Sequence, residues 1–332
     1  MSNARDTSET RHTRVAGQSP ATTPPNPDSN HTHMDAPTRA PTHTRLRTHA
    51  HSIITLQPLR TWWRDRSLVD VHGWRVSVLA KLPDSSVAMS PPMLEAIAAL
   101  KLPWKVRDPD SGIVFLLCPP GKCTIGSSSD EEGHKDDETL IACNIKHPFY
   151  LAETTTTQEQ WERITGANPS VHVGPKLPVE NVSVNDCIAF TRTCGPGFRF
   201  PHEVEWEYAC RAGSDTPFSH ANFLDADIVN YNGRYPYRDG PPGPDRRQTV
   251  DAGSMPANAW GFHEMHGNVW EWCVAAATRV SLASADGDAN VPAVMRGGSW
   301  ANHAHNCRSA SRITRASDYS RKTAGFRMAR GI

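Results

Sequence analysis

Short apolar runs separated by Gly, Pro, Asn and Asp dominate the sequence beyond residue 103. This rhythm is typical of short strands joined by turns, not of long amphipathic helices. We expect strands at 112–118, 123–126 and 149–152. The stretch 212–292 is full of turn residues and has few periodic segments, so we expect mostly loops there. A domain of this kind needs buried polar networks or bound ions to fix its loops.

Two segments beyond residue 150 carry helix signals. The first, 157–165, has Thr157 three residues before Gln160, which is the capping-box pattern, and it stops before Gly166. The second helix is expected at 185–193. The domain is therefore expected to mix short strands with a few short helices.

Residues 52–102 have a different character, with three tryptophans and strand-like alternation at 74–79. A helix is expected after Ser90, because a serine cap is followed by proline in the first turn. No chemistry is evident in this part. We interpret it as a small N-terminal element of unknown role, either a docking element or an extension of the main domain.

The first 51 residues have no Phe, Trp, Tyr or Lys and are rich in Thr and Pro. A chain without aromatic anchors cannot bury enough apolar area to offset the entropy of ordering its backbone. We therefore predict a disordered tail at 1–51.

The charge balance bears on which classes of partner can be expected. The 332 residues include 35 Lys and Arg and 35 Asp and Glu, so the formal net charge is zero. Proteins that coat nucleic acid or an anionic membrane have a basic excess, so we expect neither partner. No apolar run approaches the roughly 20 residues that span a bilayer. The polar start does not resemble a secretory signal, and we expect a cytoplasmic protein without membrane insertion.

Eight cysteines are too few for a disulfide scaffold in a chain of this length. None forms a Cys-x-x-Cys motif, which argues against zinc ribbons and thioredoxin-like sites. We expect reduced thiols.

Four segments, in order, resemble the formylglycine-generating-enzyme (sulfatase-modifying factor) superfamily. They lie at 112–170, 177–213, 258–272 and 296–327. The third ends in His-Gly-Asn-Val-Trp-Glu-Trp, and the fourth runs from Arg-Gly-Gly-Ser-Trp to Gly-Phe-Arg; both are highly specific. The resemblance implies that 103–332 forms an irregular, loop-rich α+β domain with a C-type-lectin-like fold.

The third segment contains oxygen ligands of the kind that calcium prefers. The resemblance implies a structural Ca²⁺ site, with a second one beginning at an Asn-containing turn. The residues carried over are Glu264, Gly267, Val269 and Glu271 for the first site, with Asn230 and Tyr231 for the second. The alternative is that Glu271 pairs with a buried arginine.

Other acidic and aromatic residues of these segments have simpler interpretations. Trp206, Trp270 and Trp272 are expected in the core. The trio Glu203, Glu205 and Glu207 is expected at a helix start, where acids favour the helix dipole; paired-carboxylate catalysis is the alternative.

The fourth segment departs from the family pattern. Formylglycine-generating enzymes hold Cu(I) with two cysteines spaced Cys-x₄-Cys after Gly-Gly-Ser, because Cu(I) favours soft thiolates. Here Gly-Gly-Ser is followed by Cys307 alone, with His303 and His305 as conceivable nitrogen ligands. The alternative function is thus a metal-dependent oxidase of a peptidyl cysteine. Copper would be its cofactor, Cys307 its thiolate, and Ser299 would lie nearby.

The same C-terminal framework also resembles the variable proteins of diversity-generating retroelements, in which adenine-directed mutagenesis rewrites a ligand-binding surface. Residues 301–321 are all encodable by codons ending in C, and Lys, Glu, Gln, Met and Trp are absent there. We predict a non-catalytic binding protein with a variable segment at 300–323 and a protein or glycan partner; an ordinary surface strand and loop is the alternative. The predicted ligand-binding residues are Trp300, Ala301, Asn302, His303, Ala304, His305, Asn306, Ile313, Thr314, Arg315, Asp318, Tyr319, Ser320 and Arg321.

Overall fold

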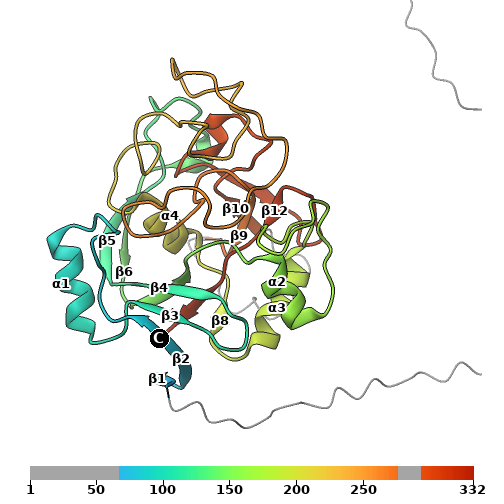
Figure 1. Cartoon of the computed structure of the whole chain (residues 1–332). Helices are drawn as coiled ribbons and strands as arrows, with labels where there is room; N and C mark the ends of the chain where they lie inside the picture. The colour runs from blue at the N-terminus through green and yellow to red at the C-terminus, as the bar shows by residue number, and fades with distance from the viewer. Residues whose placement is uncertain (1–66, 276–292) are drawn as a thin grey trace, which may run out of the picture. The chain divides into compact units, whose positions relative to one another are not determined.

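An antiparallel sheet of seven strands forms the first layer of the domain (Figure 1). The computed structural model describes residues 67–275 and 293–332, so the predicted tail at 1–51 and the start of 52–102 lie outside it. In sheet order the strands are β1 (Val69–Val71), β2 (Trp74–Ala80), β3 (Lys105–Arg107), β4 (Val114–Cys118), β7 (Phe149–Ala152), β13 (Ala329–Gly331) and β8 (Phe198–Arg199).

The strands of the N-terminal part are built into this sheet. Val78 of β2 pairs with Val106 of β3, which in turn pairs with Phe115 of β4. The ring of Trp74 packs edge-on against Phe115 and Tyr150, with centroids 5.3 and 5.5 Å away. For 67–102, this pairing favours the interpretation as an extension of the main domain.

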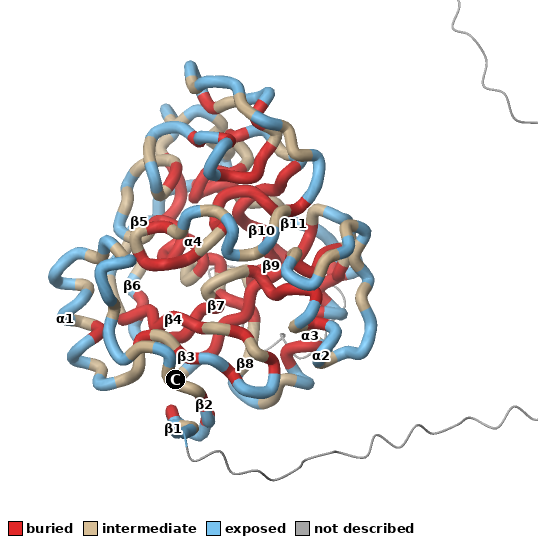
Figure 2. Tube along the Cα trace, viewed as in Figure 1, coloured by how far each residue is buried: buried red, intermediate tan, exposed pale blue. Residues whose placement is uncertain are grey.

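A second sheet of four strands supports the C-terminal part of the chain. Its order is β11 (Arg312–Arg315), β10 (Ala293–Arg296), β9 (Trp270–Cys273) and β12 (Ala324–Gly325). Every residue of β9 and β10 is buried, and Figure 2 shows these strands in red. A separate hairpin consists of β5 (Gly121–Ile125) and β6 (Ile141–Ile145).

In the part of the chain that the structure describes, four α-helices accompany the sheets: α1 (Pro91–Leu100), α2 (Gln158–Thr165), α3 (Val184–Cys194) and α4 (Glu203–Arg211). The predicted capping box at Thr157 is present, and α2 ends at Gly166 with φ 78°. Helices α2 and α3 lie side by side (Figure 1), with Trp161 stacked on Phe190 at 4.9 Å.

The expected loop-rich α+β fold is confirmed. The fully described stretch 212–269 contains no helix and only an isolated bridge. The three tryptophans expected in the core are buried, and the glutamate trio opens α4 as predicted.

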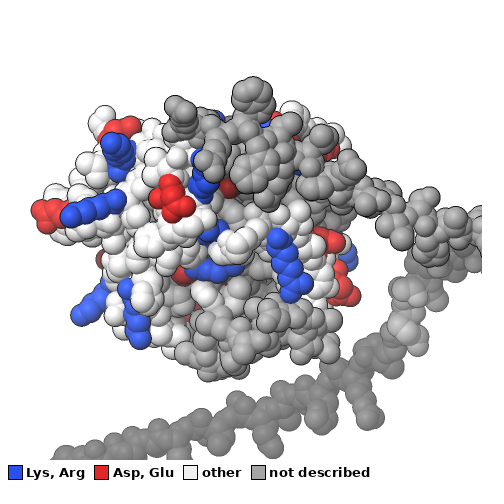
Figure 3. Space-filling model, turned by 90° about the horizontal axis from the view of Figure 1, so that it is seen from below, with Lys and Arg blue, Asp and Glu red and all other residues white. Residues whose placement is uncertain are grey.

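Charged side chains of both signs are interspersed on the face of the molecule in Figure 3. Among the described residues, no helix has the length and apolar character needed to cross a membrane.

Candidate functional site

The C-terminal segment between β10 and β12 is divided into an inner and an outer set of side chains. The inner set is buried: Ser299, Trp300, Ala304, Cys307, Arg308, Ser309, Ala310, Ser311 and Ser317. The outer set is exposed: Ala301, His303, Thr314, Arg315, Ala316, Asp318, Arg321 and Lys322. The backbone is thus held from one side while the side chains of the outer set face solvent.

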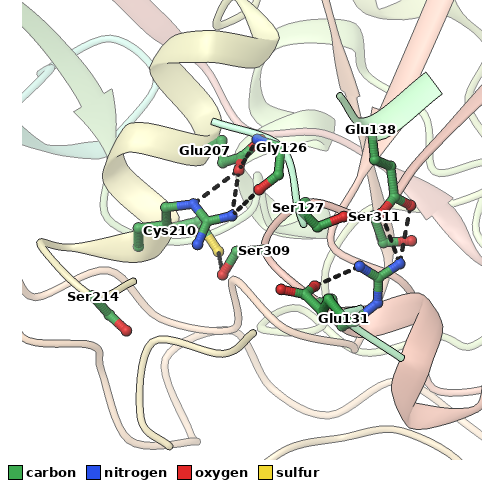
Figure 4. A network of polar contacts seen from close by, with 12 residues as sticks. Gly126, Ser127, Glu131, Glu138, Glu207, Cys210, Ser214, Ser309 and Ser311 are labelled. Atoms are coloured by element: carbon green, nitrogen blue, oxygen red, sulfur yellow. Dashed lines mark hydrogen bonds and ion pairs between the residues drawn. The ribbon is translucent and has the colours of Figure 1, made fainter. Parts of the chain in front are cut away.

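Arg308 is the first inner anchor, and its side chain is completely buried. Its guanidinium nitrogens lie 2.6 Å from Glu131 and 2.8 Å from Glu138, both in the loop between β5 and β6. Figure 4 shows the two glutamates converging on one guanidinium. A buried cation is tolerated only when such partners satisfy it. Arg308 therefore ties the segment to the β5–β6 loop.

Arg296, at the end of β10, is the second anchor. Its guanidinium donates to the carbonyls of Ser309, Ala310 and Ser311 at 3.2, 2.7 and 3.1 Å, and it pairs with Glu207 of α4. Three consecutive carbonyls therefore point at one buried cation. This arrangement fixes the backbone directly after Arg308.

His266 is the third anchor. Its Nε2 lies 3.0 Å from the backbone nitrogen of Ser219, which can only donate, so Nε2 is the acceptor. The proton of the neutral ring is then on Nδ1, which donates to the carbonyl of Cys307 at 2.7 Å. Burial lowers the pKa of His266 to about 3, so the ring is neutral near pH 7.

The outer set meets side chains from other loops. The ring of His303 stacks on Tyr235 at 3.9 Å, and His305 lies 5.5 Å from His303. Tyr235 is 47% exposed, so this stack is open to solvent. The stack offers flat aromatic area together with ring nitrogens, which is a composition found in binding surfaces.

A second group of aromatic and cationic side chains lies along the rest of the segment. The ring of Trp300 contacts His172 at 5.4 Å and the Lys322 ammonium at 5.2 Å. The ring of Tyr319 lies 5.5 Å from the Arg315 guanidinium and 5.2 Å from that of Arg321.

Three of the predicted ligand-binding residues belong to the inner side. Ala304 is completely buried and Trp300 is only 7% exposed. The Asn302 Oδ1 accepts from the Ser299 hydroxyl at 2.6 Å and from the Trp270 indole at 2.8 Å. These side chains contact the interior of the segment, and their role in ligand binding stays a prediction. The half-buried members of the predicted set are Asn302, His305, Asn306, Ile313, Tyr319 and Ser320.

Tyr235 and the loop at 168–174 also lie at this surface but were not among the predicted site residues. In that loop Val171 and Val173 are 57% and 78% exposed, on either side of His172. No periodicity indicated them, because they lie in irregular loops far from 300–323 in sequence. The exposure of the two valines is a property of the folded structure, so the sequence offered no signal for this loop.

The loop at 168–174 presents apolar side chains to water, and Glu180 holds its backbone in place. Its Oε1 accepts from the backbone nitrogens of Val171 and His172 at 2.6 and 2.8 Å. Burial raises the pKa of Glu180, while these two hydrogen bonds lower it. The loop is therefore a preorganised part of the surface next to Trp300.

Residues 107–332 match the family described as the sulfatase-modifying factor enzyme 1-like domain. The chain belongs to this family. It is 31% identical over 191 residues to the formylglycine-generating enzyme of Mycobacterium tuberculosis, which covers 50% of this chain and 62% of that protein. The match therefore spans less than two thirds of that relative.

Two solved structures are similar to this member of the family. Treponema denticola variable protein 1 superposes with a TM-score of 0.55 at 21% identity, covering 66% of this chain and 95% of that one. PvdO from Pseudomonas aeruginosa gives a TM-score of 0.56 at 26% identity, covering 69% of this chain and 98% of the other. The first likeness shows a shared fold.

Cys307 and Ser299, the residues of the alternative catalytic function, are both completely buried in this family member. Burial raises the pKa of the Cys307 thiol to about 12, so it is protonated at neutral pH. Its Sγ lies 3.8 Å from the carbonyl of His303. Within 67–275 and 293–332, no three His, Cys, Asp or Glu residues are grouped as a metal site. The single cysteine of the segment packs in the interior.

Glu271, one of the calcium ligands that the resemblance implies, already has partners within the protein. Its carboxylate pairs with the buried Arg327 at 2.6 Å and accepts from the Trp206 indole at 2.7 Å. This is the arrangement that the sequence analysis gave as the alternative. A calcium ion at this position would share the Glu271 carboxylate with a buried guanidinium and an indole N–H.

The other implied calcium ligands serve separate contacts. The Glu264 carboxylate accepts from the backbone nitrogens of Gly253 and Met255 at 2.9 and 3.0 Å. The backbone nitrogen of Gly267 donates to Gly297, and Val269 is completely buried. The amide of Asn230 donates to Gln248, while its Oδ1 has no hydrogen-bond partner among the described residues. Calcium binding by these residues stays a prediction.

Proposed function

We propose that this protein is a non-catalytic ligand-binding protein whose segment 300–323 presents a diversified surface on a formylglycine-generating-enzyme-type scaffold. The observation that carries the proposal is the division of the segment. Arg296, His266 and Arg308 hold its backbone from inside. The outer side chains make no comparable buried contacts, and a surface of this kind tolerates replacement of its side chains.

The composition of the outer surface also supports binding. Tyr235, His303 and Tyr319 supply aromatic area, and Arg315 and Arg321 supply cations that hydrogen-bond in several directions. Rigid aromatic anchors mixed with adaptable polar groups are typical of paratopes. A protein or glycan partner, without nucleic acid, remains our proposal.

The DNA around the gene tests the proposal. We expect a reverse transcriptase gene and a template repeat that differs from the 300–323 coding region only at adenines. The differing codons should fall on the outer set, such as His303, Thr314, Arg315, Asp318 and Arg321. A genome with neither feature, or differences that fall on the buried Arg308 and Ser309, would overturn the diversification.

The second candidate function is a copper-dependent oxidase of a peptidyl cysteine, favoured by the 31% identity to the Mycobacterium tuberculosis enzyme. It is tested with the purified protein, Cu(I), oxygen and a cysteine-containing peptide. We expect no conversion of the peptide cysteine to formylglycine and no thiolate–copper absorption. Conversion that disappears in Cys307→Ala would establish the oxidase and contradict the binding protein.

A further inference from the structure

Two cysteines of the β5–β6 hairpin lie directly opposite each other. Cys123 of β5 pairs with Cys143 of β6 in the antiparallel register. Side chains alternate across a strand, so opposite residues point to the same face. The neighbours Lys122 and Thr124 are exposed while Ile125 is buried, which places both cysteines on the half-buried face of the hairpin.

The register suits a disulfide. Opposite residues of an antiparallel pair have Cα atoms about 4.5–5.5 Å apart, and a disulfide accepts about 4.4–6.8 Å. Their Cβ atoms lie about 4.5–5.5 Å apart and need to approach to about 3.8 Å. A small adjustment of two strands that are free of a larger sheet achieves this.

These two thiols are also among the more accessible ones. Five of the eight cysteines are buried, whereas Cys123, Cys143 and Cys194 are partly exposed. Cys123 lines a groove of about 620 Å³ together with Met93, Tyr208 and Trp260. A small disulfide compound can therefore approach the pair along this groove, while Cys194 has no cysteine opposite it in a strand.

The surroundings slow the reaction without preventing it. Burial, then the neighbouring Cys143 and Glu207, raise the pKa of Cys123 to about 11, whereas Arg211 lowers it. Burial and Glu207 raise the pKa of Cys143 as well. Because the thiolate is the nucleophile, exchange should be faster in alkaline buffer.

We propose that Cys123 and Cys143 form a reversible disulfide by exchange with a low-molecular-weight disulfide, glutathione disulfide. One protein thiolate attacks a glutathione sulfur, forming a mixed disulfide and releasing glutathione thiolate. The other protein thiolate attacks the protein sulfur of that mixed disulfide and releases the second glutathione thiolate. Two protein thiols are oxidised and one glutathione disulfide is reduced. The two protons lost by the protein thiols pass through solvent to the two glutathione thiolates.

The disulfide would act on the C-terminal segment, and this consequence rests on the proposed binding function. The loop that joins β5 to β6 carries Glu131 and Glu138, which hold the buried Arg308. A covalent link across the base of this loop reduces the freedom of the loop when it opens. The redox state of the hairpin would thereby set how firmly the segment after Cys307 is braced.

The full chain tests the proposal. Reduced protein is incubated with glutathione disulfide at about pH 8.5, the free thiols are alkylated, and intact mass and peptide maps are recorded. We expect most chains to lose two hydrogens and to yield a linked peptide containing Cys123 and Cys143. Either Cys123→Ser or Cys143→Ser should abolish the linked peptide and retain one glutathione on the remaining thiol, while Cys194→Ser should behave like the wild type.

Stable glutathione adducts on the wild type without the linked peptide, or links between other cysteines, would overturn the disulfide. The effect on the loop has its own readout, trypsin cleavage after Lys135, which we expect to slow by roughly threefold or more on oxidation. Equal cleavage rates would overturn the bracing while leaving the disulfide established. Neither measurement depends on ligand binding, so the proposed function is tested separately.

Discussion

The inner and outer sides of segment 296–323 differ in what their side chains contact. On the inner side, charged groups are buried in pairs, such as Arg308 with Glu131 and Glu138, and Arg296 with Glu207. On the outer side, the guanidinium groups of Arg315 and Arg321 lie over the Tyr319 ring and donate to the carbonyl of the preceding residue, Thr314 or Ser320. The same residue type is therefore a structural anchor on one side and a replaceable surface group on the other.

The largest loss of stability is expected when an anchor of the inner side is removed. Arg308→Met should leave the buried Glu138 and the half-buried Glu131 without their cation and lower the free energy of unfolding by about 3–5 kcal/mol. Urea unfolding measures it. The matched control is Arg315→Met, the same change on the outer side, which should stay within about 1 kcal/mol. Equal losses for the two variants would remove the distinction between the sides.

The second largest effect is expected in the pH dependence of the free energy of unfolding, to which His266 contributes. Its pKa is lowered to about 3 in the folded protein, against roughly 6.5 in the unfolded chain. Between these values the unfolded chain binds the extra proton, so the free energy of unfolding falls as pH falls, approaching about 1.4 kcal/mol per pH unit. Unfolding curves at pH 7.5 and 5 should show a smaller drop for His266→Gln. A variant whose stability drops as steeply as that of the wild type would show that His266 is not the group responsible.

Glu180 tests whether the loop at 168–174 belongs to the preorganised part. Glu180→Gln replaces a charged acceptor of two backbone N–H groups with a weaker one, and we expect a loss of about 1–2 kcal/mol. Hydrogen exchange at Val171 and His172 should accelerate. Glu162→Gln, on the exposed face of α2, is the control and should change the free energy of unfolding by no more than about 0.5 kcal/mol and leave the exchange unchanged. Unchanged exchange in Glu180→Gln would mean that the loop is held by other contacts.

The smallest change in stability is expected for substitutions of the exposed side chains of the outer set. Alanine at Thr314, Arg315 and Asp318 should each change the free energy of unfolding by no more than about 0.5 kcal/mol, because exposed side chains away from special features contribute little. Thermal unfolding of the single variants and of the triple variant measures it. A triple variant that is several kcal/mol less stable would place these side chains among the anchors.

The local elements were predictable from the sequence because their signals are local. Thr157 and Gln160 specify the start of α2 within four residues, and the apolar run 149–152 coincides with β7. The specific third and fourth motifs indicated the family, which the match over 107–332 confirms.

The candidate site was less predictable because its contacts connect distant parts of the chain. Arg308 and Glu131 are separated by 177 residues, and no spacing rule links them. The sequence prediction placed all of residues 300–306 in the ligand-binding set, because the resemblance and the codon composition do not distinguish buried from exposed positions. Only the folded backbone separates Ala304, which is buried, from His303, which is exposed.

A pair of libraries tests the central claim most directly. One library randomises the outer positions 301, 303, 314, 315, 318 and 321, and the other randomises the inner positions 299, 304, 307, 308, 309 and 311. Both are displayed on cells, treated with protease and sequenced, which measures the fraction of folded variants. We predict that most outer-library members resist protease while few inner-library members do. Similar survival of the two libraries would contradict the account of a variable surface on a fixed backbone.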